Sequence, residues 1–162
     1  MNAIVSVTKD WAIGNEGKLL VHNREDMRFF KETTMGGTVI CGRTTFESFP
    51  GGALPGRRNI VLSRNTSYAP ADAEVVRSID EALQLMANVD PNKVWLIGGA
   101  RVYEALLPHC SRALVTWNNT SMPADAYFPN LDKDDCWHLA NTLGTGTTPS
   151  GIPFEFREYL HV

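Results

Sequence analysis

Two short apolar runs that each end in glycine constrain the fold of this chain more than any other feature. One extends from Val39 to Gly42 and the other from Val94 to Gly99. Each apolar run is too short for a helix and is typical of a buried strand, and the residues after each glycine favour a helix. After the first run, Thr44 or Thr45 is the expected N-cap. A strand that turns directly into a helix leaves backbone N–H groups free for an anion, although a tight turn alone also explains each junction.

Apolar runs alternate with helical patterns along most of the chain. This alternation predicts an α/β fold whose sheet is largely parallel, with a ligand site at the carboxyl edge of the strands. The last two runs favour an antiparallel hairpin with a long loop from 144 to 153. The expected strands are 3–7, 39–41, 59–63, 74–76, 94–97, 112–117, 137–143 and 154–160, the expected helices are 24–34, 78–89 and 100–107 with one opening after Gly42, and the expected loops include 10–23 and 121–130.

The length and composition indicate one globular domain over residues 1–162. The net charge of −3 argues against a protein built to bind nucleic acid or anionic lipid. Three cysteines without a C-x-x-C pair fit reduced thiols, and no His/Cys cluster suggests a metal site. The sequence contains no secretory signal pattern and no long apolar segment, so we expect a cytoplasmic protein without a membrane anchor.

Asp26 is the candidate acid. It lies near the start of the predicted helix 24–34, after the expected N-cap Asn23, and beside an apolar stripe that contains Met27 and Phe30. In one interpretation it is a first-turn acid that complements the helix dipole or closes a capping box. In the other it is a half-buried carboxylate whose pKa suits proton transfer. The sequence pattern leaves both open.

Arg57 is the candidate anion-binding residue. It precedes the predicted strand 59–63 and follows a loop rich in glycine and proline. It is either a solvated arginine or a guanidinium that binds a ligand carboxylate with two hydrogen bonds.

Taken in order, the motifs resemble those of the dihydrofolate reductase family over nearly the whole chain. The resemblance rests on the ordered set and on no single motif. The matching segments are Ile13-Gly14, Gly17–Leu19, Asp26-Met27, Phe30-Lys31, Val39–Ser48, Leu54–Ser63, Ile97–Tyr103, Leu114–Thr116 and Asp125–Pro129.

The resemblance implies reduction of 7,8-dihydrofolate to tetrahydrofolate with NADPH as cofactor, in support of one-carbon metabolism. It implies a central eight-stranded, mostly parallel sheet with an antiparallel C-terminal edge strand and about four helices. Asp26 matches the family's catalytic acid, which promotes protonation at N5 of the pterin, and Thr116 matches its hydroxyl partner. It also implies a small-molecule substrate, antifolate inhibitors and a monomer.

The binding positions are likewise implied by the resemblance. Arg57 matches the residue that binds the substrate's glutamate tail. The other substrate-binding positions are Ile4, Val5, Ser6, Met27, Phe30, Thr45, Phe49, Leu54 and Ile97. The cofactor-binding positions are Ile13, Gly14, Leu19, Gly42, Arg43, Thr44, Thr45, Leu62, Ser63, Arg64, Arg77, Gly98, Gly99, Ala100, Arg101 and Val102.

One departure stands out at Leu20 and Val21, where the family usually has Pro-Trp. Without the stiff proline and the indole we expect a more mobile loop over residues 10–23 and a roomier pterin side of the pocket. Two alternatives remain: a related pteridine or pyrimidine reductase on the same fold, and a catalytically weak nucleotide-binding paralogue.

Overall fold

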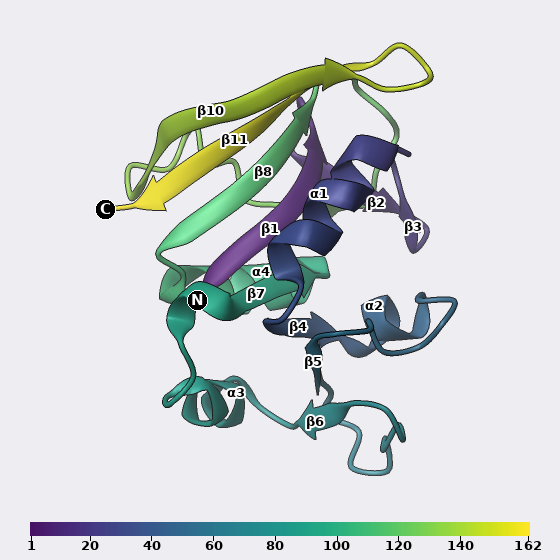
Figure 1. The fold of residues 1–162 in the computed structure, drawn as a ribbon, viewed down its shortest axis with the longest axis vertical. Helices are drawn as coiled ribbons and strands as arrows, with labels where there is room; N and C mark the ends of the chain where they lie inside the picture. Colours follow the sequence, from purple (N-terminus) through teal and green to yellow (C-terminus); the bar gives the residue numbers. More distant parts are fainter.

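The computed structural model describes residues 1–162 and shows one large sheet with helices on both faces (Figure 1). The eight-stranded sheet has the order β10-β11-β8-β1-β7-β4-β5-β6, and a three-stranded sheet has the order β3-β2-β9. The strands are β1 (Asn2–Thr8), β2 (Ala12–Asn15), β3 (Lys18–Leu19), β4 (Thr38–Gly42), β5 (Arg58–Leu62), β6 (Glu74–Val76), β7 (Val94–Gly98), β8 (Arg112–Asn118), β9 (Ala126–Tyr127), β10 (Trp137–Thr147) and β11 (Pro153–His161).

The helices are short and follow the strands, as the sequence predicts. They are α1 (Arg24–Thr34), α2 (Arg43–Glu47), α3 (Ile79–Met86) and α4 (Ala100–Leu106), with 3₁₀ turns η1 (Pro91–Lys93) and η2 (Leu107–His109). Asn23 caps α1 and Ser78 caps α3, as expected. The cap of α2 differs from the prediction: the helix begins at Arg43, and the N-cap is Gly42 in place of Thr44 or Thr45.

The sheet is parallel except at one strand. β1, β4, β5, β6, β7 and β8 pair in parallel, whereas β11 runs antiparallel to β8 and to the edge strand β10. This confirms the predicted mostly parallel eight-stranded sheet, with β11 one position inside the edge. Because the parallel strands share a direction, their carboxyl ends lie at the same edge of the sheet, and this edge includes the ends of β1, β4, β5, β7 and β8.

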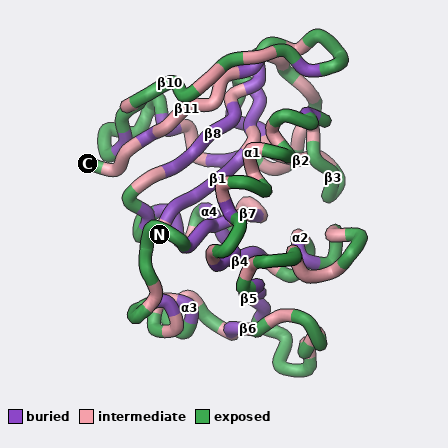
Figure 2. Tube along the Cα trace, in the orientation of Figure 1, coloured by how far each residue is buried: buried purple, intermediate pink, exposed green.

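Helices cover the two faces of the sheet differently. On one face, α3 and α4 contribute to the largest buried cluster, together with Val5, Ile40, Leu96 and Val115. On the other face, Phe29 and Phe30 of α1 pack against a second cluster, whose members are Ile4, Val39, Trp95 and Leu114. Figure 2 shows the buried residues concentrated along the central strands β1, β7 and β8.

Two segments predicted as loops contain strands. Within residues 10–23, β2 and β3 form a hairpin, and Glu16 and Gly17 at its tip both have positive φ angles. β2 also pairs with β9, which lies within the predicted loop 121–130. The sequence pattern missed these strands because each is short, and because β2 and β9 pair across a long stretch of the chain.

The C-terminal hairpin is longer than predicted. β10 continues to Thr147, which pairs with Pro153, so the connecting loop spans only 148–152. Glycines had suggested an earlier end, but Gly146 is needed inside the strand: a Cβ there would lie 2.6 Å from the ring of Phe154. Two register shifts bend β10 along its length.

Candidate active site

The side chain of Asp26 on α1 meets that of Thr116 on β8. Thr116 Oγ1 donates a hydrogen bond to Asp26 Oδ1 at 2.5 Å. Asn23 caps the start of α1, and its Oδ1 accepts hydrogen bonds from the N–H groups of Glu25 and Asp26 at 3.1 and 3.2 Å. The Asp26 carboxylate is therefore not occupied in capping and turns toward the sheet, which favours the interpretation of a held carboxylate.

The surroundings of Asp26 shift its proton affinity toward neutral pH. Burial raises the pKa of Asp26 to about 6, although hydrogen bonds from the hydroxyls of Thr116 and Ser6 oppose the rise. With this pKa about a tenth of the carboxyl groups carry a proton at pH 7. A carboxyl group with such a pKa can hold and release a proton under physiological conditions.

Apolar side chains from several elements surround this part of the sheet. Ile4, Phe30, Leu54 and Ile97 belong to one cluster between α1 and the sheet. Phe49 belongs to an adjoining cluster that also contacts Ile97. The structure therefore brings together most of the predicted substrate-binding side chains beside Asp26.

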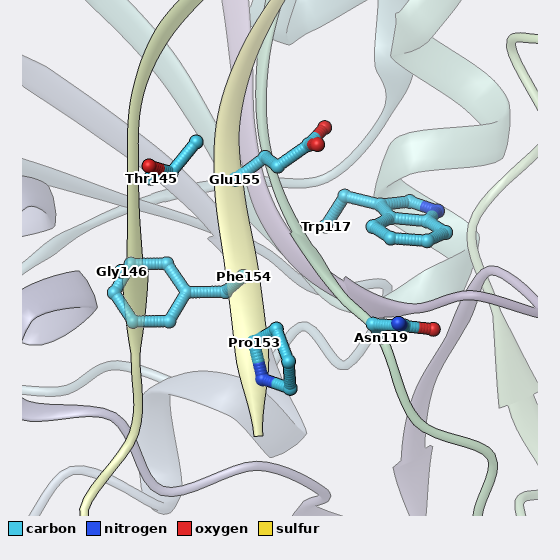
Figure 3. Close-up of a pocket in the computed structure, with 7 residues that line it drawn as sticks. All are labelled: Trp117, Asn119, Thr145, Gly146, Pro153, Phe154 and Glu155. Carbon is cyan, nitrogen blue, oxygen red and sulfur yellow. The ribbon is translucent and has the colours of Figure 1, made fainter. Parts of the chain in front are cut away.

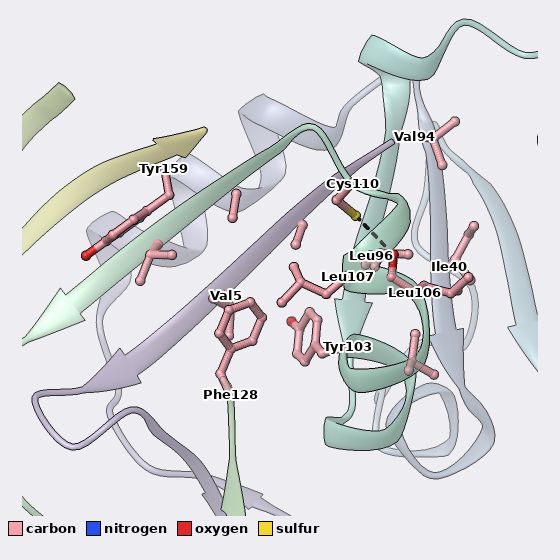
Figure 4. Close-up of a cluster of buried hydrophobic side chains, with 14 of the residues drawn as sticks. Val5, Ile40, Val94, Leu96, Tyr103, Leu106, Leu107, Cys110, Phe128 and Tyr159 are labelled. Atoms are coloured by element: carbon pink, nitrogen blue, oxygen red, sulfur yellow. Dashed lines mark hydrogen bonds between the residues drawn. The ribbon is translucent and has the colours of Figure 1, made fainter. Parts of the chain in front are cut away.

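Two predicted substrate residues, Val5 and Met27, are not part of this apolar cluster. Val5 points to the opposite face, into the cluster under α4, because side chains alternate along β1 (Figure 4). Its side chain therefore cannot face the substrate beside Asp26, which corrects the prediction for this residue and leaves only its main chain available. Met27 follows Asp26 on α1 and is 63 % exposed.

Arg57 is held in place by its neighbours. Its Nε donates to the carbonyl oxygen of Pro55 at 2.9 Å, and its Nη1 donates to Oγ1 of Thr34 at 3.1 Å. Thr34 is fully buried at the end of α1, and its hydroxyl donates to the carbonyl of Phe30. These contacts leave the other guanidinium N–H groups without a protein partner, so Arg57 is positioned and can still bind an anion.

The two strand–glycine–helix junctions lie next to each other. A Cβ added at Gly42 would come within 4.0 Å of the Gly99 nitrogen, and one added at Gly99 would lie 3.4 Å from Thr45 Oγ1. The peptide bond between Gly98 and Gly99 is cis. Neither α2 nor α4 has a side chain that caps its first N–H groups. At these paired junctions the glycines let a ligand come close to the backbone, and the uncapped N–H groups can donate hydrogen bonds to it. Both features fit a phosphate-bearing ligand.

Several of the predicted cofactor-binding side chains border these junctions. Arg43 pairs with Glu47 at 2.7 Å and lies over the ring of Tyr68. Arg64, which follows Ser63 at the end of β5, is exposed and makes no hydrogen bond or ion pair. Thr44, Ala100 and Arg101 lie in the first turns of α2 and α4, Val102 packs against Gly42, and Leu62 ends β5.

The guanidinium of Arg77 forms its hydrogen bonds with the backbone of this chain. Its guanidinium donates to the carbonyl oxygens of Asn65, Thr66 and Tyr68. The resemblance places Arg77 among the cofactor-binding residues, and the structure shows that its guanidinium is bonded to the segment that follows Ser63.

The predicted loop residues Ile13, Gly14 and Leu19 lie in the small sheet. Ile13 packs on the core and Leu19 on β3 is 51 % exposed. Val21 is 5 % exposed, so the position where the family usually has tryptophan is filled and buried. The expected mobility of this segment stays a prediction.

A surface pocket lies near the carboxyl end of β8 and the C-terminal hairpin (Figure 3). Its lining residues are Trp117, Asn119, Thr145, Gly146, Pro153, Phe154 and Glu155. None of the predicted catalytic or binding residues is among them.

Comparisons with known proteins agree with this geometry. The sequence model described as dihydrofolate reductase matches residues 1–161. The chain belongs to the dihydrofolate reductase family. It is 36 % identical over 157 residues to the dihydrofolate reductase of Neisseria gonorrhoeae, covering 97 % of this chain and 95 % of the relative. It is 41 % identical over 126 residues to the Mycobacterium tuberculosis enzyme, covering 75 % and 74 %.

A solved structure matches the fold closely. Dihydrofolate reductase from Enterococcus faecalis, complexed with NADP(H) and RAB-propyl, superposes with a TM-score of 0.87 and 31 % identity, over 99 % of this chain and 95 % of that one. The protein is accordingly an oxidoreductase that reduces dihydrofolate with NADPH. None of its helices combines the length and apolar character needed to span a membrane.

Sequence reasoning missed the residues that hold this dihydrofolate reductase site in shape. Thr34 fixes Arg57, Tyr103 on α4 donates to the carbonyl oxygen of Ile4 at 2.7 Å, and Asn118 contacts Ser6. The partners in each pair are at least 23 positions apart in the chain. No local pattern signals such contacts.

Proposed function

We propose that Asp26 and Thr116 form the proton-delivering pair of this dihydrofolate reductase. The observation that carries the proposal is the hydrogen bond from Thr116 to a half-buried Asp26. Burial raises the pKa of this carboxyl to about 6, so the proton is available near neutral pH.

The chemistry divides between the cofactor and the chain. When bound, NADPH supplies the hydride that reduces the pterin ring. Asp26 hydrogen-bonds the pterin and favours a proton at N5, and Thr116 holds the carboxylate in one orientation. The apolar residues Ile4, Phe30, Phe49, Leu54 and Ile97 exclude water and orient the rings.

Arg57 binds the carboxylate of the substrate's glutamate tail in this proposal. Its contacts with Thr34 and Pro55 fix the direction of the guanidinium, and a planar guanidinium matches a carboxylate with two hydrogen bonds. A pteridine or pyrimidine reductase whose substrate lacks the tail has no need for such an arginine.

The residues around the two junctions fit NADPH. The uncapped N–H groups after Gly42 and Gly99 would hold its pyrophosphate, and Arg43, Arg64 and nearby hydroxyls would hold its 2′-phosphate. Arg77 acts by holding the segment after Ser63 in place.

We further propose that residues 1–162 act as one domain, as a monomer in the cytoplasm without a nucleic-acid partner. The net charge of −3 and the thiols Cys41, Cys110 and Cys136, none of which forms a disulfide, support this proposal.

The test is the absorbance of NADPH during turnover of the purified protein with 7,8-dihydrofolate. We expect oxidation that depends on both compounds, with kcat/KM at least about tenfold higher for NADPH than for NADH, about 1.4 kcal/mol. A dihydropterin without the glutamate tail should be a poorer substrate. Equal use of both cofactors would contradict the 2′-phosphate assignment, and equal use of both substrates would favour the related pteridine reductase.

A further inference from the structure

Asn118 is a fully buried polar residue at the end of β8, two positions after Thr116. Its Nδ2 donates to Ser6 Oγ at 3.0 Å, to the Val7 carbonyl oxygen at 2.8 Å and to the Thr116 carbonyl oxygen at 3.3 Å. Rotating the amide by half a turn would place its oxygen against two carbonyl oxygens, so these contacts fix which side the nitrogen occupies.

This orientation determines what the Ser6 hydroxyl can do. Because Ser6 Oγ accepts a hydrogen bond from Asn118, its own proton is directed to another acceptor. Ser6 pairs with Thr116 in the register of β1 and β8, so its hydroxyl lies on the same face of the sheet, beside the Thr116 hydroxyl that donates to Asp26. Two neighbouring strands therefore each carry a hydroxyl on the face of the sheet that Asp26 approaches.

The amide is kept at an energetic cost. Asn118 Oδ1 is buried and has no hydrogen-bond partner. An unpaired buried acceptor is unfavourable, and an apolar side chain of the same size would avoid the penalty. Close packing alone does not require an asparagine here.

We propose that Asn118 is a positioning residue that fixes the Ser6 hydroxyl as a hydrogen-bond donor to Asp26. The proposal rests on the proposed function of Asp26 as the proton carrier, but the orientation of Ser6 can be tested without turnover. Its consequence is that Asp26 titrates at a lower pH than burial and Thr116 alone would set, since a donor to the carboxylate favours the charged form.

Other charged groups do not account for this effect. At the level of Thr116, β11 presents Phe156, while Glu155 and Arg157 alternate to the other face, where Arg157 lies over Trp117. On α1 itself, Arg24, Glu25 and Arg28 are exposed. Across the sheet, the phenol of Tyr103 is bonded to the Ile4 carbonyl oxygen, and the Asp26 charge contributes to raising the pKa of that phenol.

The experiment is a titration of the Asp26 carboxyl carbon by NMR in the ligand-free protein. Ser6→Ala and Asn118→Leu should each raise the titration midpoint by about 1 to 2 pH units, as expected for loss of one hydrogen bond to a charged group. The double variant should titrate no higher than Ser6→Ala, because Asn118 acts through Ser6. Ser6→Thr keeps the hydroxyl and should restore the midpoint. Asn119→Leu, an exposed neighbour, is the matched control and should leave it unchanged.

A folded Asn118→Leu protein with the wild-type midpoint would overturn the proposal, as would additive shifts in the double variant. If the leucine variant does not fold, Asn118→Ala, which adds no bulk, is measured in its place. An unchanged midpoint in Ser6→Ala would also contradict the proposal. The pH dependence of turnover in the same variants separates the two claims. A shifted titration with an unshifted rate profile would support the positioning and refute Asp26 as the proton carrier.

Discussion

The ring of Phe29 on α1 stacks on the ring of Phe156 on β11, with centroids 4.4 Å apart. Phe156 is in register with Thr116 on the neighbouring strand β8, and Phe29 lies one helical turn after Asp26. The stacking therefore holds the helix over the strand so that Asp26 and Thr116 meet. An antiparallel strand from the end of the chain thus positions an acid near its beginning.

Thr116→Val tests the hydroxyl partner. Valine keeps the shape of threonine but cannot donate a hydrogen bond, so the carboxylate of Asp26 loses its nearest donor. The pKa of Asp26 should rise above about 6. The limiting rate at low pH should fall, because the carboxyl group loses the hydroxyl that orients it, while the pH profile should move to higher pH with the pKa. The measurement is kcat/KM for dihydrofolate between pH 5 and 9, with Thr120→Val as the control. A profile that stays in place would show that the Thr116 hydroxyl does not act on the acid.

Asp26→Asn should stabilise the protein at neutral pH. The folded-state pKa of Asp26 is raised from 3.8 to about 6, so its protonated form contributes stability below pH 4. That stability is lost as the pH rises through 6, because the buried carboxyl must ionise. Asparagine carries no charge to bury, and the gain at pH 8 should be about 1 to 2 kcal/mol after allowance for partial exposure.

Urea unfolding of Asp26→Asn and the wild-type protein at pH 4.5 and pH 8 checks this expectation. The difference in free energy of unfolding should be larger at pH 8. A variant that is less stable than wild type at both pH values would mean that the carboxylate serves the fold through the helix dipole.

Arg57→Lys tests the binding of the substrate tail. Lysine keeps the charge but loses the planar group that bridges Thr34 and Pro55 and meets a carboxylate with two bonds. KM for dihydrofolate should rise by about tenfold, equivalent to about 1.4 kcal/mol, while KM for NADPH stays the same. Arg58→Lys is the matched control, because Arg58 pairs with Glu74 on β6. An equal loss with a dihydropterin that lacks the tail would refute the assignment.

The parts of the fold that depend on local signals could be predicted from the sequence. The cap at Asn23, the helix after it and the two strand–glycine–helix junctions follow from residues within a few positions of each other. The pairing of Ala12 with Tyr127 depends on a segment far along the chain, so β2 and β9 looked like loops. Period-two alternation could have indicated that Val5 faces away from Ile4, but matching to family positions did not use it.

The side chains that support the site were beyond prediction for the same reason. The contacts of Arg77 could not be predicted because its carbonyl partners lie in a segment without a recognisable pattern. The resemblance to the family identified Asp26 and Thr116 as a pair. It could not show that Ser6 and Asn118 join them, since that contact arises only when β1 and β8 lie side by side.

The most direct test of the account is the rate of dihydrofolate reduction by Asp26→Asn in single-turnover stopped flow with saturating NADPH. We expect the wild-type rate to fall as the pH rises through about 6, the pKa of Asp26. The asparagine variant should bind NADPH normally, lose most of its rate at pH 7 and show no inflection near that pKa, because an amide cannot deliver the proton. Wild-type rates with an unchanged pH profile in Asp26→Asn would contradict the account, since a residue that serves only the start of the helix is replaced by asparagine without loss of activity.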